Sequence, residues 1–158
     1  MRVESCMPIP SAAKQLNVFL ARFSPEIVAL AKAARAKLRK RFPRAIEMVY
    51  DNYNALVIGF GPDTRTSDAL FSIAVYPRWV TLFFLKGATL PDPDQVLKGS
   101  GTTVRHVVLD GPETLGLPAV HALMAEALRR ARPSINPAGR RALIIKSVSP
   151  RQRPRRPS

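Results

Sequence analysis

Apolar side chains recur with a helical period near the start of the chain. Ser24-Pro25-Glu26 is a typical helix start, because serine caps free amides, proline suits the first turn and an acid complements the helix dipole. The apolar positions that follow are Ile27, Leu30, Ala31, Ala34 and Leu38. This pattern predicts an amphipathic helix that ends before Pro43, with a shorter helix before it over residues 11–22.

The middle of the chain changes to short apolar runs rich in branched and aromatic residues, which favour strands. The expected strands span residues 46–50, 55–60, 70–76, 79–85 and 104–109. Pro77-Arg78 separates two of these runs and predicts a tight hairpin. Pro118 then opens a second amphipathic helix.

This order of elements predicts an α+β fold, with an antiparallel sheet of four or five strands and two main helices packed on one face. We place a single domain over residues 12–132. Prolines recur in the remaining segment, and each removes an amide donor and opposes a helix or an inner strand. We therefore expect residues 133–158 to form a Pro/Arg-rich basic flexible tail. Its apolar patch, residues 143–145, either docks on the body or pairs briefly with a sheet edge.

The charge is distributed unevenly along the 158 residues, which carry 25 Lys and Arg against 11 Asp and Glu, a formal net charge of +14. Seven bases lie between Lys32 and Arg44, ten lie from Arg129 onward, and no acid follows Glu126. Two basic segments beside a body with more acids than bases favour an anionic partner. The alternative is that the tail only increases solubility.

The single cysteine, Cys6, excludes an internal disulfide and a zinc cluster and fits a reducing compartment. The first residues contain no apolar run typical of a secretory signal, and no stretch approaches the roughly 20 apolar residues of a membrane span. We expect a soluble, cytoplasmic protein.

Several segments together carry a family resemblance. A Tyr76-Pro77 to Leu85 strand pair is followed by Leu97-Lys98-Gly99-Ser100-Gly101 and Val104-Arg105-His106-Val107. This arrangement, after an N-terminal amphipathic helix, resembles the YdhG-like domain family of small bacterial proteins over about residues 14–132. The resemblance implies an α+β sandwich of the frataxin-like kind. It implies no assigned activity for most members, although some are connected to iron handling.

A frataxin-like iron-binding or iron chaperone role is therefore one alternative. Frataxin-type binding relies on a ridge of carboxylates, since hard cations need several oxygen ligands close together. Here the first long helix carries Glu26 alone and then seven bases through Arg44, a surface that repels iron. The carboxylates left for a weak site are Glu47, Asp51, Asp92 and Asp94. We expect no metal site and no cofactor.

A glycine-rich loop supplies the first candidate anion site, formed by Lys98, Ser100, Arg105 and His106. Glycines let backbone amides point at an anion, and a hydroxyl and cations complete the cradle. The spacing is not that of a phosphate-binding loop, and the segment precedes a strand. The alternative is a turn that only fixes the strand register.

The basic stripe of the first long helix, Lys32, Arg35 and Arg39, is the second candidate anion site. Phosphate neutralisation is sufficient for non-specific nucleic-acid binding, and no motif that reads base sequence is present. The alternative is a solvated helix face. A third group, Asp51, Tyr53 and Trp79, is expected to line a pocket, although Asp51-Asn52-Tyr53-Asn54 is also a typical turn.

Catalysis has little support in the sequence, because the only histidines are His106 and His121 and no nucleophile elbow or metal-ligand spacing occurs. We expect a non-enzymatic binding domain that engages an anionic partner through its basic first helix and tail. That partner is nucleic acid bound non-specifically, or a small anion. A small enzyme that uses the Lys98–His106 segment is the second alternative.

Overall fold

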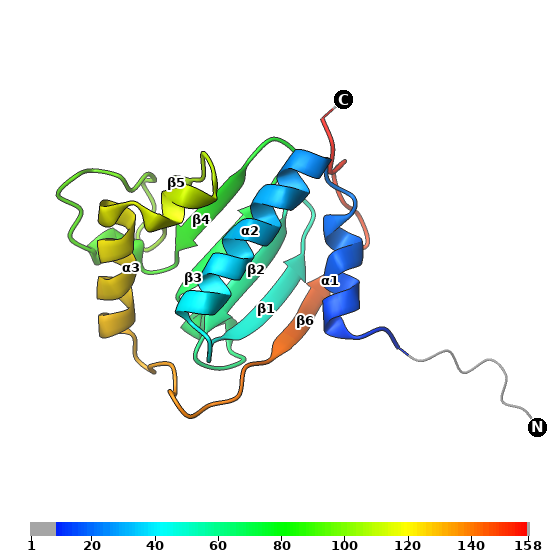
Figure 1. The fold of residues 1–158 in the computed structure, drawn as a ribbon. Coiled ribbons are helices and arrows are strands. Elements are labelled where there is room, and N and C mark those ends of the chain that lie inside the picture. The colour runs from blue at the N-terminus through cyan, green and yellow to red at the C-terminus, as the bar shows by residue number, and fades with distance from the viewer. Residues whose placement is uncertain (1–8, 158) are drawn as a thin grey trace, which may run out of the picture.

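The computed structural model describes residues 9–157 (Figure 1). Its α-helices are α1 (Ala12–Leu20), α2 (Pro25–Arg41) and α3 (Pro118–Arg130). Its strands are β1 (Ile46–Asp51), β2 (Leu56–Gly61), β3 (Phe71–Val75), β4 (Val80–Phe84), β5 (Arg105–Val108) and β6 (Leu143–Val148). Short 3₁₀ turns occur at Thr66–Asp68, Gly87–Thr89 and Pro112–Gly116. Within this part of the chain, none of the helices combines the length and apolar character needed to cross a membrane.

The strands form one six-stranded mixed sheet in the order β5-β4-β3-β2-β1-β6. The strands from β1 to β5 pair antiparallel, whereas β6 pairs parallel with β1, with Glu47 opposite Leu143 and Val49 opposite Ile145. The expected antiparallel sheet of four or five strands is therefore wrong. The described residues form three α-helices, of which α1 is the shorter helix expected over residues 11–22.

The sixth strand comes from the segment that we set apart as a flexible tail. Residues 138–149 contain no proline, so the argument from proline does not apply between Pro137 and Pro150. The apolar patch 143–145 lies inside this window, and Leu143 and Ile145 pack against the core. The patch thus forms part of a strand at the sheet edge, where nearby prolines are tolerated.

The helices cover one face of the sheet, with α2 crossing its middle and α1 beside it near β1 and β6 (Figure 1). Alternate strand residues such as Ile58, Ile73 and Leu82 point into this layer and are fully buried. They belong to one core with Ala34 and Leu38 of α2. Burying each large apolar side chain stabilises the fold by roughly 1.5–3 kcal/mol, so this layer fixes α2 on the sheet.

Three loops meet at one end of the sheet because of the strand directions. β1 and β6 run parallel and both finish at this end, where the β1–β2 turn and the β3–β4 hairpin also lie. The chain after β6 continues there, beside the start of α2 (Figure 1). Segments about 75 and 100 residues apart are thereby brought together.

Candidate functional site

An open pocket of about 630 Å³ lies where these loops meet. Its lining consists of Asn54 from the β1–β2 turn, residues 76–79 from the β3–β4 hairpin, and Arg153, Pro154, Arg156 and Pro157 from the C-terminal segment. The hairpin and the C-terminal segment therefore form its two main walls. We call this the Arg/Trp pocket.

The hairpin wall is held by its backbone and by two aromatic rings that contact each other at a tilted angle. The amide of Tyr76 donates to the carbonyl of Trp79 at 2.9 Å, which closes the turn next to the Val75–Val80 strand pair. The Tyr76 and Trp79 rings lie 5.5 Å apart between centroids. Trp79 nevertheless keeps 46% of its surface exposed. A large aromatic surface is thus presented to solvent on a fixed strand end.

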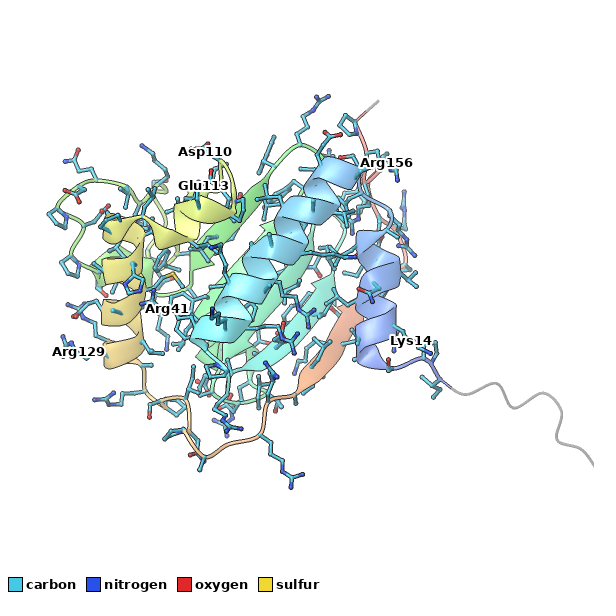
Figure 2. All side chains as sticks on the ribbon, viewed as in Figure 1. Lys14, Arg41, Asp110, Glu113, Arg129 and Arg156 are labelled. Atoms are coloured by element: carbon cyan, nitrogen blue, oxygen red, sulfur yellow. The ribbon has the colours of Figure 1, made fainter. Side chains whose placement is uncertain are left out.

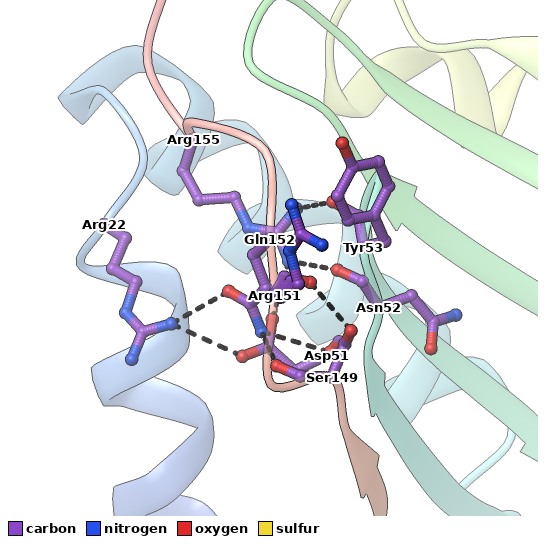
Figure 3. A network of polar contacts seen from close by, with 8 residues as sticks. All are labelled: Arg22, Asp51, Asn52, Tyr53, Ser149, Arg151, Gln152 and Arg155. Atoms are coloured by element: carbon purple, nitrogen blue, oxygen red, sulfur yellow. Dashed lines mark hydrogen bonds and ion pairs between the residues drawn. The ribbon is translucent and has the colours of Figure 1, made fainter.

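The C-terminal wall is fixed by a buried ion pair between Arg155 and Asp51 (Figure 3). Nη2 of Arg155 donates to Oδ1 of Asp51 at 2.9 Å and to the carbonyl of Asn52 at 2.6 Å. Both residues are at least 95% buried, and the guanidinium also lies over the Phe23 ring. Arg155 therefore attaches the end of the chain to the β1–β2 turn.

Other contacts extend this attachment on both sides of Arg155 (Figure 3). The amide of Ser149 and the side-chain amide of Gln152 both donate to the carbonyl of Asp51. Arg22 donates to the side-chain oxygen of Gln152 at 3.0 Å and lies 3.5 Å from Oδ2 of Asp51. The amide of Arg153 donates to the carbonyl of Tyr53. The segment from 149 to 156 is thus held by both its backbone and its side chains.

Positive charge is concentrated around the Arg/Trp pocket. Arg78, Arg153 and Arg156 are all exposed, and no acidic residue is among the described lining residues. Nε of Arg156 donates to the carbonyl of Arg22, and the guanidinium of Arg153 lies 5.9 Å from the Tyr53 ring centre. Neither contact neutralises the charge, so three cations remain available to an anion.

Asp51, Tyr53 and Trp79, which we expected to line one pocket, do not all line it. Trp79 lines the Arg/Trp pocket. Tyr53 is 48% exposed beside it and contacts Arg153 through its ring and its carbonyl. Asp51 lies beneath the C-terminal segment with 1% exposure, where it binds Arg155. The carboxylate therefore anchors one pocket wall and does not face the ligand space.

The helix stripe lies over a second, smaller groove of about 310 Å³, which Lys32, Arg35 and Arg39 help to line. Two of these cations already bind the buried carboxylate of Glu47. Arg35 donates to both of its oxygens at 2.7 and 3.1 Å, and Nε of Arg39 lies 3.2 Å from Oε1. The stripe therefore fixes α2 on β1, and Lys32 is left as the cation without an acidic partner among the described residues.

The glycine-rich loop is held by backbone hydrogen bonds and by the side chain of Arg105. Lys98 and His106 form a backbone bridge, with amide–carbonyl distances of 2.8 and 2.9 Å. Gly99 between them has φ +119°, a conformation that favours glycine. Nη1 of Arg105 donates to the carbonyls of Gly101 and Val104. This geometry fixes the loop against β5. Lys98 and Ser100 are both exposed, so anion binding at this loop stays a prediction.

The carboxylates considered for a weak metal site do not meet in space. Glu47 and Asp51 are each taken by arginines, and the two oxygens of Asp92 accept the amides of Val96 and Leu97. Residues 9–157 contain no cluster of three or more His, Cys, Asp or Glu side chains suited to a metal ion. Cys6 lies outside the described residues.

Arg78, Arg153 and Arg156 are charged pocket residues that the sequence did not single out as a site. Arg78 had a usable signal, because it occupies the exposed turn next to Trp79. For Arg153 and Arg156, only the richness of the tail in arginine was visible. The signal that places them is the buried Arg155–Asp51 pair, which joins residues 104 positions apart.

Comparisons of the chain with protein-family models, curated proteins and solved structures give no match. The resemblance to the YdhG-like domain family therefore stays a prediction.

Proposed function

We propose that this protein is a non-enzymatic binding domain whose Arg/Trp pocket binds a phosphate-bearing anionic ligand. The observation that carries the proposal is the convergence of Arg78, Arg153 and Arg156 on one open pocket whose described lining contains no acid. Guanidinium groups bind phosphate oxygens through paired, charge-assisted hydrogen bonds. Since Arg155 fixes the wall that carries Arg153 and Arg156, little ordering is needed when an anion binds.

The cations available to an anion lie on the C-terminal segment and the hairpin more than on the first long helix. Arg35 and Arg39 are already paired with Glu47, so their charge is partly neutralised. The C-terminal arginines that line the pocket have no such partner among the described residues. We therefore assign anion binding to the tail and the hairpin, with the helix as a structural element.

Inorganic polyphosphate is a suitable test ligand because it carries phosphates and no other recognition element. The Arg153→Ser/Arg156→Ser double variant should bind it more weakly. The slope of log K against log salt should also become shallower by about 1.4, using roughly 0.7 per phosphate contact as for single strands. Isothermal calorimetry at several salt concentrations measures both quantities.

The matched control is Arg140→Ser/Arg141→Ser, which removes the same charge from exposed positions. These residues precede β6, whereas the pocket arginines follow it, so the two sites lie roughly 20 Å apart or more along the strand. Figure 2 shows Arg156 near one end of the molecule, with Arg41 and Arg129 toward the other. Equal losses in the two double variants would show that binding follows net charge alone, and the proposal would fail.

A further inference from the structure

Trp79 is not explained by anion binding alone. Simple anions need cations and hydrogen-bond donors, and an indole supplies one N–H donor and no charge, so its large ring face is left unexplained. Yet Trp79 lines the same pocket as the three arginines, and its ring is held against Tyr76 at 5.5 Å. The hairpin therefore presents a positioned aromatic surface directly beside a cationic one.

Aromatic surfaces beside cations are the combination that binds nucleotides without reading their sequence. Bases stack on aromatic rings while arginines and lysines follow the phosphates. The pocket volume of about 630 Å³ is within the range of small-molecule sites, and its open shape leaves room for a chain to enter and leave. Pro154 and Pro157 line the opposite wall and add apolar surface.

We propose that the Arg/Trp pocket holds a nucleotide unit, with the base against Trp79 and the phosphate between Arg153 and Arg156. This inference rests on the proposed function, because it names the ligand class of the same pocket. A strand of single-stranded nucleic acid and a free nucleotide present the same chemistry. A duplex does not, since its bases are stacked within the helix.

The single tryptophan makes the site directly observable, because all intrinsic tryptophan fluorescence of the protein comes from Trp79. Oligothymidylate should quench this fluorescence in a saturable way. An abasic oligonucleotide of the same length carries the same phosphates and should quench it little. Thymidine monophosphate, measured in the same way, tests binding of a free nucleotide. If it binds as tightly as the oligonucleotide the ligand is a free nucleotide, and if the oligonucleotide binds more tightly the ligand is a strand.

Substitution of Trp79 tests whether the base contact determines affinity. By anisotropy of labelled ligands, Trp79→Leu should bind oligothymidylate roughly 5- to 150-fold more weakly, the range expected for loss of one base stack. Its affinity for the abasic oligonucleotide should stay unchanged. Trp79→Phe keeps an aromatic face and should retain most of the preference for bases, which separates stacking from damage to the hairpin.

Two results would overturn this inference, and they differ from failure of the proposed function. If the wild type binds the two oligonucleotides equally, or if Trp79→Leu keeps the preference for bases, the nucleotide assignment fails while anion binding in the pocket stands. If neither oligonucleotide nor polyphosphate binds, both proposals fail.

Discussion

The carboxylate of Asp51 and the guanidinium of Arg155 are both removed from solvent, so each depends on the other for its charge to be tolerated. Taking a charge out of water costs several kcal/mol unless a partner and hydrogen bonds offset it. Here the partner is present, and the carbonyls of Asn52 and Tyr53 accept further hydrogen bonds from the guanidinium. Replacing only one of these two residues therefore destabilises the fold strongly.

We expect Arg155→Met to lower the free energy of unfolding by about 3 kcal/mol, because it leaves the Asp51 carboxylate buried with only the more distant Arg22. Urea denaturation followed by circular dichroism measures this change. Arg151→Met is the matched control, since Arg151 is exposed in the same segment and should change stability by less than about 0.5 kcal/mol. Equal effects of the two substitutions would contradict a buried ion pair.

Glu126 in α3 is a surface carboxylate whose environment still affects its titration. Hydrogen bonds from Arg129 and Arg130 lower the pKa of Glu126 from 4.5 to about 2. A carboxyl whose pKa is lower in the folded state stabilises that state above the unfolded pKa. This contribution is lost as the pH falls from about 4.5 through 2.

We therefore expect wild-type stability to fall more steeply between pH 5 and pH 2.5 than that of Glu126→Gln, as measured by urea unfolding across this range. The difference should be modest, because exposed ion pairs are weak, and it should shrink in 0.5 M salt. Identical pH profiles at low salt would show that these arginines do not stabilise the folded state through Glu126.

At the scale of the elements, β6 and the segment after it have separate roles. β6 covers the outer edge of β1 and contacts α1, so it belongs to the sheet. Residues 149–157 form no strand and instead build one wall of the Arg/Trp pocket. The two parts can be separated by truncation.

A chain that ends at residue 148 should retain the sheet with reduced stability and should lose polyphosphate binding. A chain that ends at residue 142 exposes the edge of β1 and uncovers the apolar residues beneath α1, so we expect it to aggregate or remain unfolded. Far-UV circular dichroism and size-exclusion chromatography distinguish these states. Polyphosphate binding by the chain ending at 148 would contradict the role given to the C-terminal segment.

The elements formed by local patterns could be predicted from the sequence, because their periodicity lies within a few residues. The stripe from Ile27 to Leu38 became α2, and the apolar runs on both sides of Pro77-Arg78 became β3 and β4. β6 could not be placed in this way. Its parallel pairing with β1 depends on a contact almost 100 residues away, which no local pattern encodes.

Residues of the candidate site that depend on contacts between distant parts of the chain could not be placed from the sequence either. Exposed aromatic and polar residues near turns pointed to Trp79 and Tyr53, and both lie at or beside the pocket. Asp51 was expected to face that pocket but is buried, because the partner that covers it comes from the far end of the chain. Charge density alone also favoured the helix stripe, whose arginines are held by Glu47, an acid on a different element.

At the scale of the whole molecule, ligand binding and attachment of the C-terminal segment form one equilibrium. The ligand contacts Arg153 and Arg156 in the proposed complex, and these residues flank Arg155, whose pair with Asp51 helps to hold their segment in place. When the competent form is only a fraction of the molecules, the apparent Kd rises in inverse proportion to that fraction. Asp51 should therefore affect affinity although it lies outside the pocket lining.

We expect Asp51→Asn to weaken polyphosphate binding about tenfold, which corresponds to about 1.4 kcal/mol of lost attachment. Saturating ligand should in turn raise the melting temperature of this variant more than that of Arg153→Ser/Arg156→Ser, since binding and attachment are linked.

Glu47→Gln is the matched control, because it also disrupts a buried carboxylate on β1 but one held by α2. It should lower stability without raising the Kd, since it leaves the C-terminal segment attached. A similar rise in Kd for both variants would mean that general destabilisation, and not attachment of the C-terminal segment, governs binding.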